Sequence, residues 1–304
     1  MILPVMSAVV EIFGLFAIGW IAHHWGYIDQ KETVRWSRFS IDFLLPAYIF
    51  SSITQGFEPD RLHELWPLPF IGIGLVIMGA STGLLLRYGL FTRNRDLKKT
   101  YLHFCAVNNS GYLPIIIIRN LWGESALANL FFFNLGTTLG MWTIGVGVLG
   151  EIRILHSLRT VLTPNLVAVL LGLFFSLSGL QAFVPSTVRN ILMTAGSAAV
   201  PMMLILIGAS FHRPGLIRVS WPVFYASASR LLLLPLIAVI ILNLLPISRE
   251  VYKIAVVVAL MPVAVSSTIL TIRYGGDPDY AAQTSITTSV AAIITVPLAL
   301  HFLL

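Results

Sequence analysis

The chain has 304 residues, of which 57% are hydrophobic and only 11% are charged. Soluble domains carry about 25% charged residues, so this composition excludes an ordinary soluble globular protein and indicates one that lies in the lipid bilayer. The net charge of +6 comes from lysine and arginine residues in short loops between apolar stretches, where such residues typically set the orientation of membrane spans. We therefore expect no nucleic-acid partner.

Apolar stretches follow one another along the chain, each close to the roughly 20 residues that a helix needs to cross the hydrocarbon core. We predict ten spans, at residues 3–22, 33–54, 65–86, 100–118, 125–150, 163–180, 190–211, 222–245, 251–272 and 280–303. The first span has neither a positively charged leader nor a small-residue cleavage site after it, which favours a retained helix over a signal peptide. The sequence therefore predicts an all-α integral membrane protein.

Lysine and arginine residues are distributed unequally between the two sides of the predicted bundle. The loops and helix ends after odd-numbered spans carry 13 of them, and those on the opposite side carry five. The positive-inside rule then places the odd loops in the cytoplasm and both termini outside.

The two halves of the chain share a weak pattern. The matches, in chain order, are Gly-Leu-Phe at 14–16 and 172–174, Pro46 and Pro201, and Pro114 and Pro262. Because five predicted helices separate the copies, the second copy must be inverted in the membrane. We predict two inverted five-helix repeats, at residues 1–155 and 156–304.

Pro114 and Pro262 lie among small and polar residues inside spans four and nine. A proline removes a backbone donor and clashes with the carbonyl one turn back, so both spans are predicted to be broken helices whose exposed backbone faces protein or a watery cavity. The alternative is a kinked but continuous helix. A break would direct the positive N-terminal end of a half-helix at an anion.

Polar side chains cluster at the first break, and fewer lie at the second. Such groups are costly in hydrocarbon, and either ligand contact or interhelical hydrogen bonding explains them. The substrate-binding residues that we predict are Asn108, Asn109, Ser110, Gly111, Tyr112 and Pro114 at the first break and Pro262, Val263, Ser266 and Ser267 at the second. Neither break contains an acidic residue, which favours a small organic anion, a carboxylate, over a cation.

Four ionisable residues stand in otherwise apolar spans, and such positions are functional candidates. Asp42, beside Pro46, is suited to bind a proton or to pair with Arg230. For Arg230, a structural ion pair and anion binding both remain open. Glu11 is close enough to the interface for its side chain to reach water, and His103 is more typical of a packing histidine than of a titrating one.

Several stretches resemble the auxin efflux carrier family, which includes plant PIN proteins and bacterial carriers described as malate or malonate permeases. They are NNSGYLPI, TPNLVAVLLGLFFSL, GSAAVPMMLILIGASF, SRLLLLPLIAV and MPVAVSSTILTIRYGGDPDYAAQ. The loop between spans five and six is short, which is similar to the bacterial branch and unlike PIN proteins with long cytosolic loops. A bacterial cytoplasmic (inner) membrane location follows from this resemblance.

The resemblance implies helices 4 and 9 that cross at the midplane, in a fold similar to those of sodium/bile-acid symporters and NhaA. It implies a scaffold of spans 1, 2, 6 and 7, a mobile transport domain of spans 3–5 and 8–10, an elevator mechanism and a homodimer. It also implies that Pro164 and Asn165 help to frame the substrate cavity. A plain helix start, capped by Thr163, explains these two residues equally well.

Other functions lack their sequence signals. No P-loop, HExxH, CxxC or GxSxG motif is present, and the single cysteine, Cys105, excludes an internal disulfide. We expect no enzyme activity, catalytic residue, cofactor or metal site. The predicted function is secondary transport of a small organic anion. The alternatives are a sodium-coupled symporter of the bile-acid type and a membrane receptor built on a transporter fold.

Overall fold

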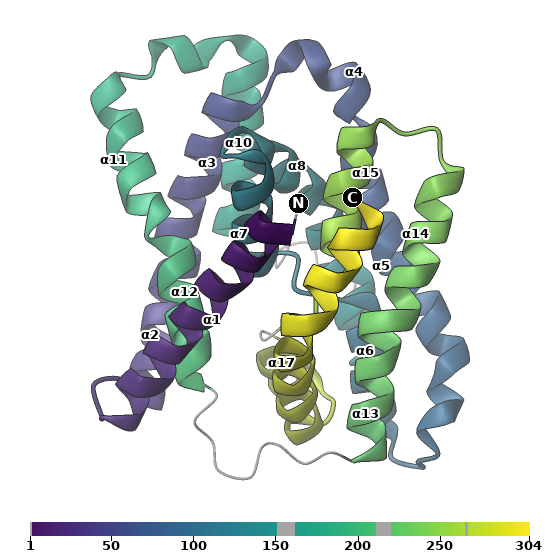
Figure 1. The fold of residues 1–304 in the computed structure, drawn as a ribbon. Coiled ribbons are helices and arrows are strands. Elements are labelled where there is room, and N and C mark those ends of the chain that lie inside the picture. Colours follow the sequence, from purple (N-terminus) through teal and green to yellow (C-terminus); the bar gives the residue numbers. More distant parts are fainter. Residues whose placement is uncertain (1, 151–161, 211–219, 265–266) are drawn as a thin grey trace. The chain divides into compact units, whose positions relative to one another are not determined.

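The computed structural model describes residues 2–150, 162–210, 220–264 and 267–304 (Figure 1). Every regular element in these ranges is helical, with η marking short 3₁₀ or π turns. In chain order they are α1 Ile2–His24, α2 Gln30–Phe39, η1 Ser40–Leu44, α3 Leu45–Gly56, η2 Pro59–Arg61, α4 Leu62–Leu65, α5 Pro67–Leu86, η3 Arg87–Leu90, α6 Arg95–Ala106, α7 Tyr112–Trp122, α8 Ser125–Gly140, η4 Met141–Gly145, α10 Pro164–Ser178, η5 Leu180–Phe183, α11 Ser186–Ser197, α12 Ala199–Ser210, α13 Trp221–Ala228, η6 Ser229–Leu233, α14 Leu234–Leu244, α15 Arg249–Ala259, α16 Ser267–Tyr274 and α17 Pro278–Leu303.

Five helical stretches of the described chain are long and apolar enough to cross a membrane. They are Met6–His24, Pro59–Leu90, Ser186–Ser210, Trp221–Leu244 and Pro278–Leu303. Two apolar helices, α7 and α10, are shorter. The structure thus agrees with an all-α membrane protein, while ten spans in two inverted repeats stay a prediction.

Two compact units are present, and each is drawn from both halves of the sequence. The first comprises Met1–Leu65, Tyr112–Phe132 and Leu162–Arg213, and the second comprises Trp66–Gly111, Phe133–Val161 and Pro214–Leu304. A division of the sequence at residue 155 into two repeats stays a prediction.

In the first unit, α1 packs against α12 and α7, and α3 packs against α10 and α11 (Figure 1). The contact between α1 and α12 depends on Gly19 and Gly208. A Cβ atom on Gly19 would overlap the carbonyl group of Ile205, and one on Gly208 would overlap the backbone of Phe16. Small residues that allow such a close approach are typical of helix pairs in membranes.

An ion pair also joins α1 to α7. Arg119 Nη2 lies 2.6 Å from Glu11 Oε1, and Asn120 Nδ2 donates to Glu11 Oε2 at 2.9 Å. The side chains of Glu11 and Arg119 are about one third exposed, at 34% and 27%. Glu11 is therefore a paired carboxylate between two helices, rather than one that extends alone to the interface.

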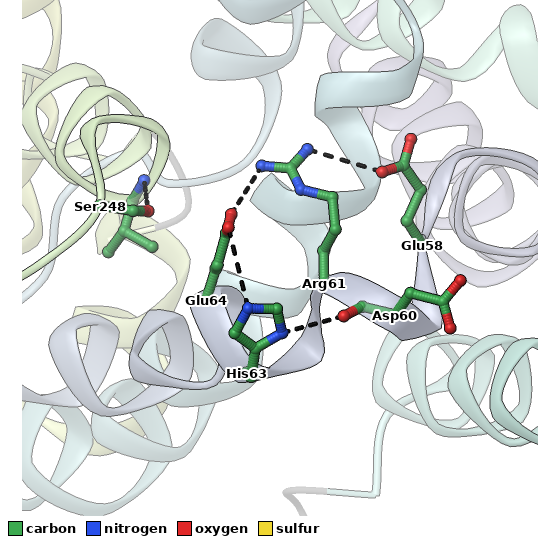
Figure 2. A network of polar contacts seen from close by, with 7 residues as sticks. Glu58, Asp60, Arg61, His63, Glu64 and Ser248 are labelled. Atoms are coloured by element: carbon green, nitrogen blue, oxygen red, sulfur yellow. Dashed lines mark hydrogen bonds and ion pairs between the residues drawn. The ribbon is translucent and has the colours of Figure 1, made fainter.

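A second polar network lies around η2 and α4, at the end of the first segment of the first unit. Figure 2 shows Arg61 between Glu58 and Glu64, at 3.6 Å and 3.1 Å. The ring of His63 donates from Nδ1 to the carbonyl oxygen of Asp60 at 2.9 Å. These side chains are largely in contact with solvent, so each pair contributes at most about 1 kcal/mol to stability.

In the second unit, α5 packs against α6, α14 against α15, and α17 against α13 and α16. Aromatic residues pack in the core, and the hydroxyl groups of two tyrosines form hydrogen bonds to neighbouring helices. The Tyr101 hydroxyl group donates to Ser229 Oγ at 3.0 Å, and that of Tyr280 donates to the carbonyl oxygen of Pro222 at 3.0 Å. These contacts hold α6 and α17 against the helical stretch Trp221–Leu244, which carries Arg230.

Candidate substrate site at two helix interruptions

Two helices of the second unit end close to one another in the middle of predicted spans. Helix α6 ends at Ala106, and α15 ends at Ala259. The segments that follow meet in an antiparallel bridge between Asn108 and Val263, and the Asn109 N–H group donates to the carbonyl oxygen of Pro262 at 2.9 Å. The next helices of the described chain begin at Tyr112 and at Ser267.

Arg230 lies at both of these helix ends. Its Nη1 donates to the carbonyl oxygen of Cys105 at 3.3 Å, its Nη2 to that of Ala259 at 2.9 Å and its Nε to that of Met261 at 3.1 Å. Only 5% of Arg230 is exposed. One buried side chain therefore satisfies three of the carbonyl groups at the two helix ends.

Asn108 adds a further link across the crossing. Its Nδ2 donates to the carbonyl oxygen of Val258, in the last turn of α15. A residue that the sequence assigned to substrate contact thus has its amide group in a structural bond to the other broken helix.

Each interruption is also held by a helix that follows it. At the first, Asn134 Nδ2 on α8 donates to the carbonyl oxygen of Ser110 at 3.0 Å, and Thr137 orients Asn134 through a bond of 3.1 Å. At the second, Thr288 on α17 accepts from the Val263 N–H group at 3.3 Å. The sequence offers only one signal for these residues, a polar side chain inside an apolar span.

Asn109 and Ser110 are the groups best placed to receive a ligand. Asn109 is 5% exposed, and its amide group makes no hydrogen bond to another described residue. The Ser110 hydroxyl group likewise has no partner in the described chain. Donors that are positioned but not used within the protein are typical of a binding site.

Ser267 has a different role from the one that the sequence suggested. It is fully buried, and its Oγ lies 3.0 Å from His103 Nε2. His103 Nδ1 lies 2.7 Å from the carbonyl oxygen of Gly145, to which it can only donate. The neutral imidazole then accepts from Ser267, which makes His103 a satisfied packing histidine. Ser266 lies outside the described residues.

Of the remaining predicted site residues, Gly111 belongs to the second unit, and Tyr112, Pro114, Pro164 and Asn165 belong to the first. Tyr112 and Pro114 form the first turn of α7, where a missing N–H group costs no helical hydrogen bond. Thr163 caps α10 by accepting from the Leu166 N–H group at 3.2 Å, and Pro164 is exposed. The helix-start interpretation of Pro164 is thus observed. A ligand contact of Asn165, whose buried Oδ1 has no hydrogen-bond partner among the described residues, stays a prediction.

Three residues near the interruptions or in predicted functional positions lie on π-helical turns. Asp42 lies on η1, Gly145 on η4 and Arg230 on η6. The Asp42 carboxylate is close enough to the Tyr112 phenol to interact with it electrostatically. Single π turns are frequent at functional sites, because they redirect side chains from the regular helical face.

Gly79 on α5 allows this helix to pack against the end of α6. A Cβ atom at Gly79 would overlap the carbonyl group of Cys105, which Arg230 also contacts. We expect Gly79→Ala to destabilise the protein by about 1–3 kcal/mol, since overpacking here displaces backbone. Melting temperatures in detergent measure the effect. Gly74→Ala on the same helix is the control, because nothing lies within 4 Å of that position. Equal melting temperatures for the two variants would contradict the prediction.

Comparison with known proteins covers nearly the whole chain. The model of a family described as membrane transport protein matches residues 4–153 and 148–300. An uncharacterized transporter of Methanothermobacter thermautotrophicus is 27% identical over 300 residues, which are 96% of this chain and 96% of the relative. An uncharacterized transporter of Methanocaldococcus jannaschii is 22% identical over 299 residues, which are 96% of this chain and 97% of the relative.

Proposed function

This chain belongs to the membrane transport protein family, and we propose that it is a secondary transporter that moves a small organic anion, a carboxylate, across the cytoplasmic membrane. Family membership and the transporter relatives point to a transporter rather than an enzyme. The integral membrane assignment agrees with the apolar helices of the described chain.

The observation that carries the proposal is the pairing of two interrupted helices at Asn108 and Val263. Discontinuous helices of this kind form substrate sites in secondary transporters. Asn109 and Ser110 offer donors there, while α7 and α16 are the next described helices along the chain and have positive N-terminal ends. The described residues between the half-helices include no acid, which favours an anion.

We further propose an elevator mechanism on two inverted repeats. Two features support it: each compact unit draws helices from both halves of the chain, and the family model matches two successive segments that meet near residue 150. Spans 1, 2, 6 and 7 would be the scaffold and form a homodimer in the lipid bilayer, although the first unit also contains α7, the second half of predicted span 4. Spans 3–5 and 8–10 would form the mobile domain that carries the crossing, and both termini would lie outside.

A thermal-shift screen of the purified protein against small carboxylates and matched amines tests the substrate class. A ligand at 100 times its dissociation constant stabilises the folded state by about 2.7 kcal/mol. We expect stabilisation by carboxylates and none by the amines. Counterflow of the hit in liposomes then separates a carrier from a receptor, because a receptor binds without exchange. Stabilisation by amines alone would contradict an anion carrier.

Proton coupling is proposed for Asp42. If its carboxylate carries the coupled proton, Asp42→Asn should abolish the stimulation of uptake by a pH gradient and leave exchange intact. Uptake and exchange of a radiolabelled carboxylate, measured with and without the gradient, give both quantities. Asp29→Asn at the cap of α2 is the control. Unchanged gradient dependence in Asp42→Asn would assign Asp42 to structure.

A further inference from the structure

Arg230 is a buried cation whose partners in the second unit are all carbonyl oxygens. It bonds to Cys105, Ala259 and Met261, and no described carboxylate of this unit forms an ion pair with it. A charge with so little exposure needs compensation. The compensation comes from the C-terminal ends of α6 and α15, which carry negative partial charge.

Carbonyl oxygens in such positions bind the coupling ions in other transporters. Unwound carbonyl groups and half-helix C-termini coordinate sodium or protons in such folds. In this chain, Arg230 occupies three of these carbonyl groups, and Asn108 and the Asn109 N–H group occupy those of Val258 and Pro262. The crossing therefore already has donors where a cation would bind.

We propose that Arg230 is the resident cation of the crossing: it holds the two broken helices together and takes the place of a coupling sodium ion. This inference rests on the proposed transport function. Arginine suits the role because its guanidinium group is always charged and presents five N–H donors in a rigid fork, which lysine cannot match. Transport should accordingly need no sodium.

A small cavity, which Arg230 lines, makes a chemical test possible. It measures about 10 Å³, room for about one water molecule, and Asn108 and Thr137 also line it. Removal of the side chain in Arg230→Gly enlarges this space. We expect guanidinium chloride at low millimolar concentration to raise the melting temperature of Arg230→Gly, and urea to have no such effect. Urea is a planar donor of the same shape but carries no charge.

Arg95→Gly is the matched control, because Arg95 is exposed at the start of α6. It should respond to neither compound. Equal rescue by urea, or rescue of Arg95→Gly, would overturn the proposal. If Arg230→Gly does not fold, Arg230→Lys and Arg230→Met replace it. The lysine variant should then have the higher melting temperature, and a methionine variant of equal or higher melting temperature would overturn the proposal.

Transport supplies an independent measurement. Replacing sodium with choline should leave the uptake of a carboxylate by the parent protein unchanged within about twofold, and Arg230→Lys should lower the maximal rate about tenfold. Sodium-dependent uptake would overturn the inference. The melting measurements need no substrate, so a failure to transport any carboxylate would count against the proposed function alone.

Discussion

Replacing Asn109 with aspartate is expected to lower the apparent affinity for a carboxylate about a thousandfold. The Asn109 N–H group is fixed by the carbonyl oxygen of Pro262, so the new carboxylate would occupy the position of the present amide group. Two negative charges about 4 Å apart repel by about 4 kcal/mol at an effective dielectric constant near 20, which corresponds to roughly three orders of magnitude. Uptake of a radiolabelled carboxylate into liposomes over a concentration series measures the affinity.

Asn94→Asp is the control for this substitution. Asn94 is the exposed N-cap of α6, and aspartate caps a helix as well as asparagine does. It introduces the same charge into the same unit, and uptake should be unchanged. If Asn109→Asp transports a carboxylate with nearly the parent affinity while its melting temperature is normal, the substrate does not lie beside Asn109.

The positions of the interruptions could be predicted from sequence, because proline and small residues act on the local backbone. The residues that hydrogen-bond to the interrupted segments could not be predicted in this way. Arg230 contacts Cys105, a residue 125 positions away, and hydrogen bonds over such separations follow from tertiary packing, not from local pattern. Asp42 and Arg230 were recognised as unusual, but their π-helical turns have no signature in the sequence.

Sequence also does not show which of the predicted substrate-binding side chains are free to bind a ligand. Polarity in an apolar span predicts that a side chain needs a partner, but it does not say which partner. Asn108 and Ser267 satisfy that need inside the protein, through Val258 and His103. Asn109 has an equally polar side chain, yet makes no such bond to a described residue. Only coordinates separate these cases.

The double substitution of Pro114 and Pro262 by alanine is expected to reduce transport at least about tenfold, because it favours continuous helices over the crossing. Each replacement removes a helix penalty of about 3 kcal/mol. The crossing is held by the bonds from Asn109 to Pro262, from Asn108 to Val258 and from Val263 to Thr288, worth about 1 kcal/mol each. Arg230 adds three hydrogen bonds to the same crossing, so one replacement should leave the interruptions in place and only the two together should shift the balance appreciably toward continuous helices.

Hydrogen exchange and uptake together test this balance. In the double variant, amide groups of residues 107–111 should exchange more slowly as a helix forms, while uptake falls and membrane insertion is retained. Pro297→Ala is the control, because Pro297 lies inside the uninterrupted helix α17 and should not affect transport. Full transport by the double variant would mean that the prolines do not maintain the interruptions. The hydrogen bonds of Arg230 and Asn108 would then be sufficient to hold both helices open.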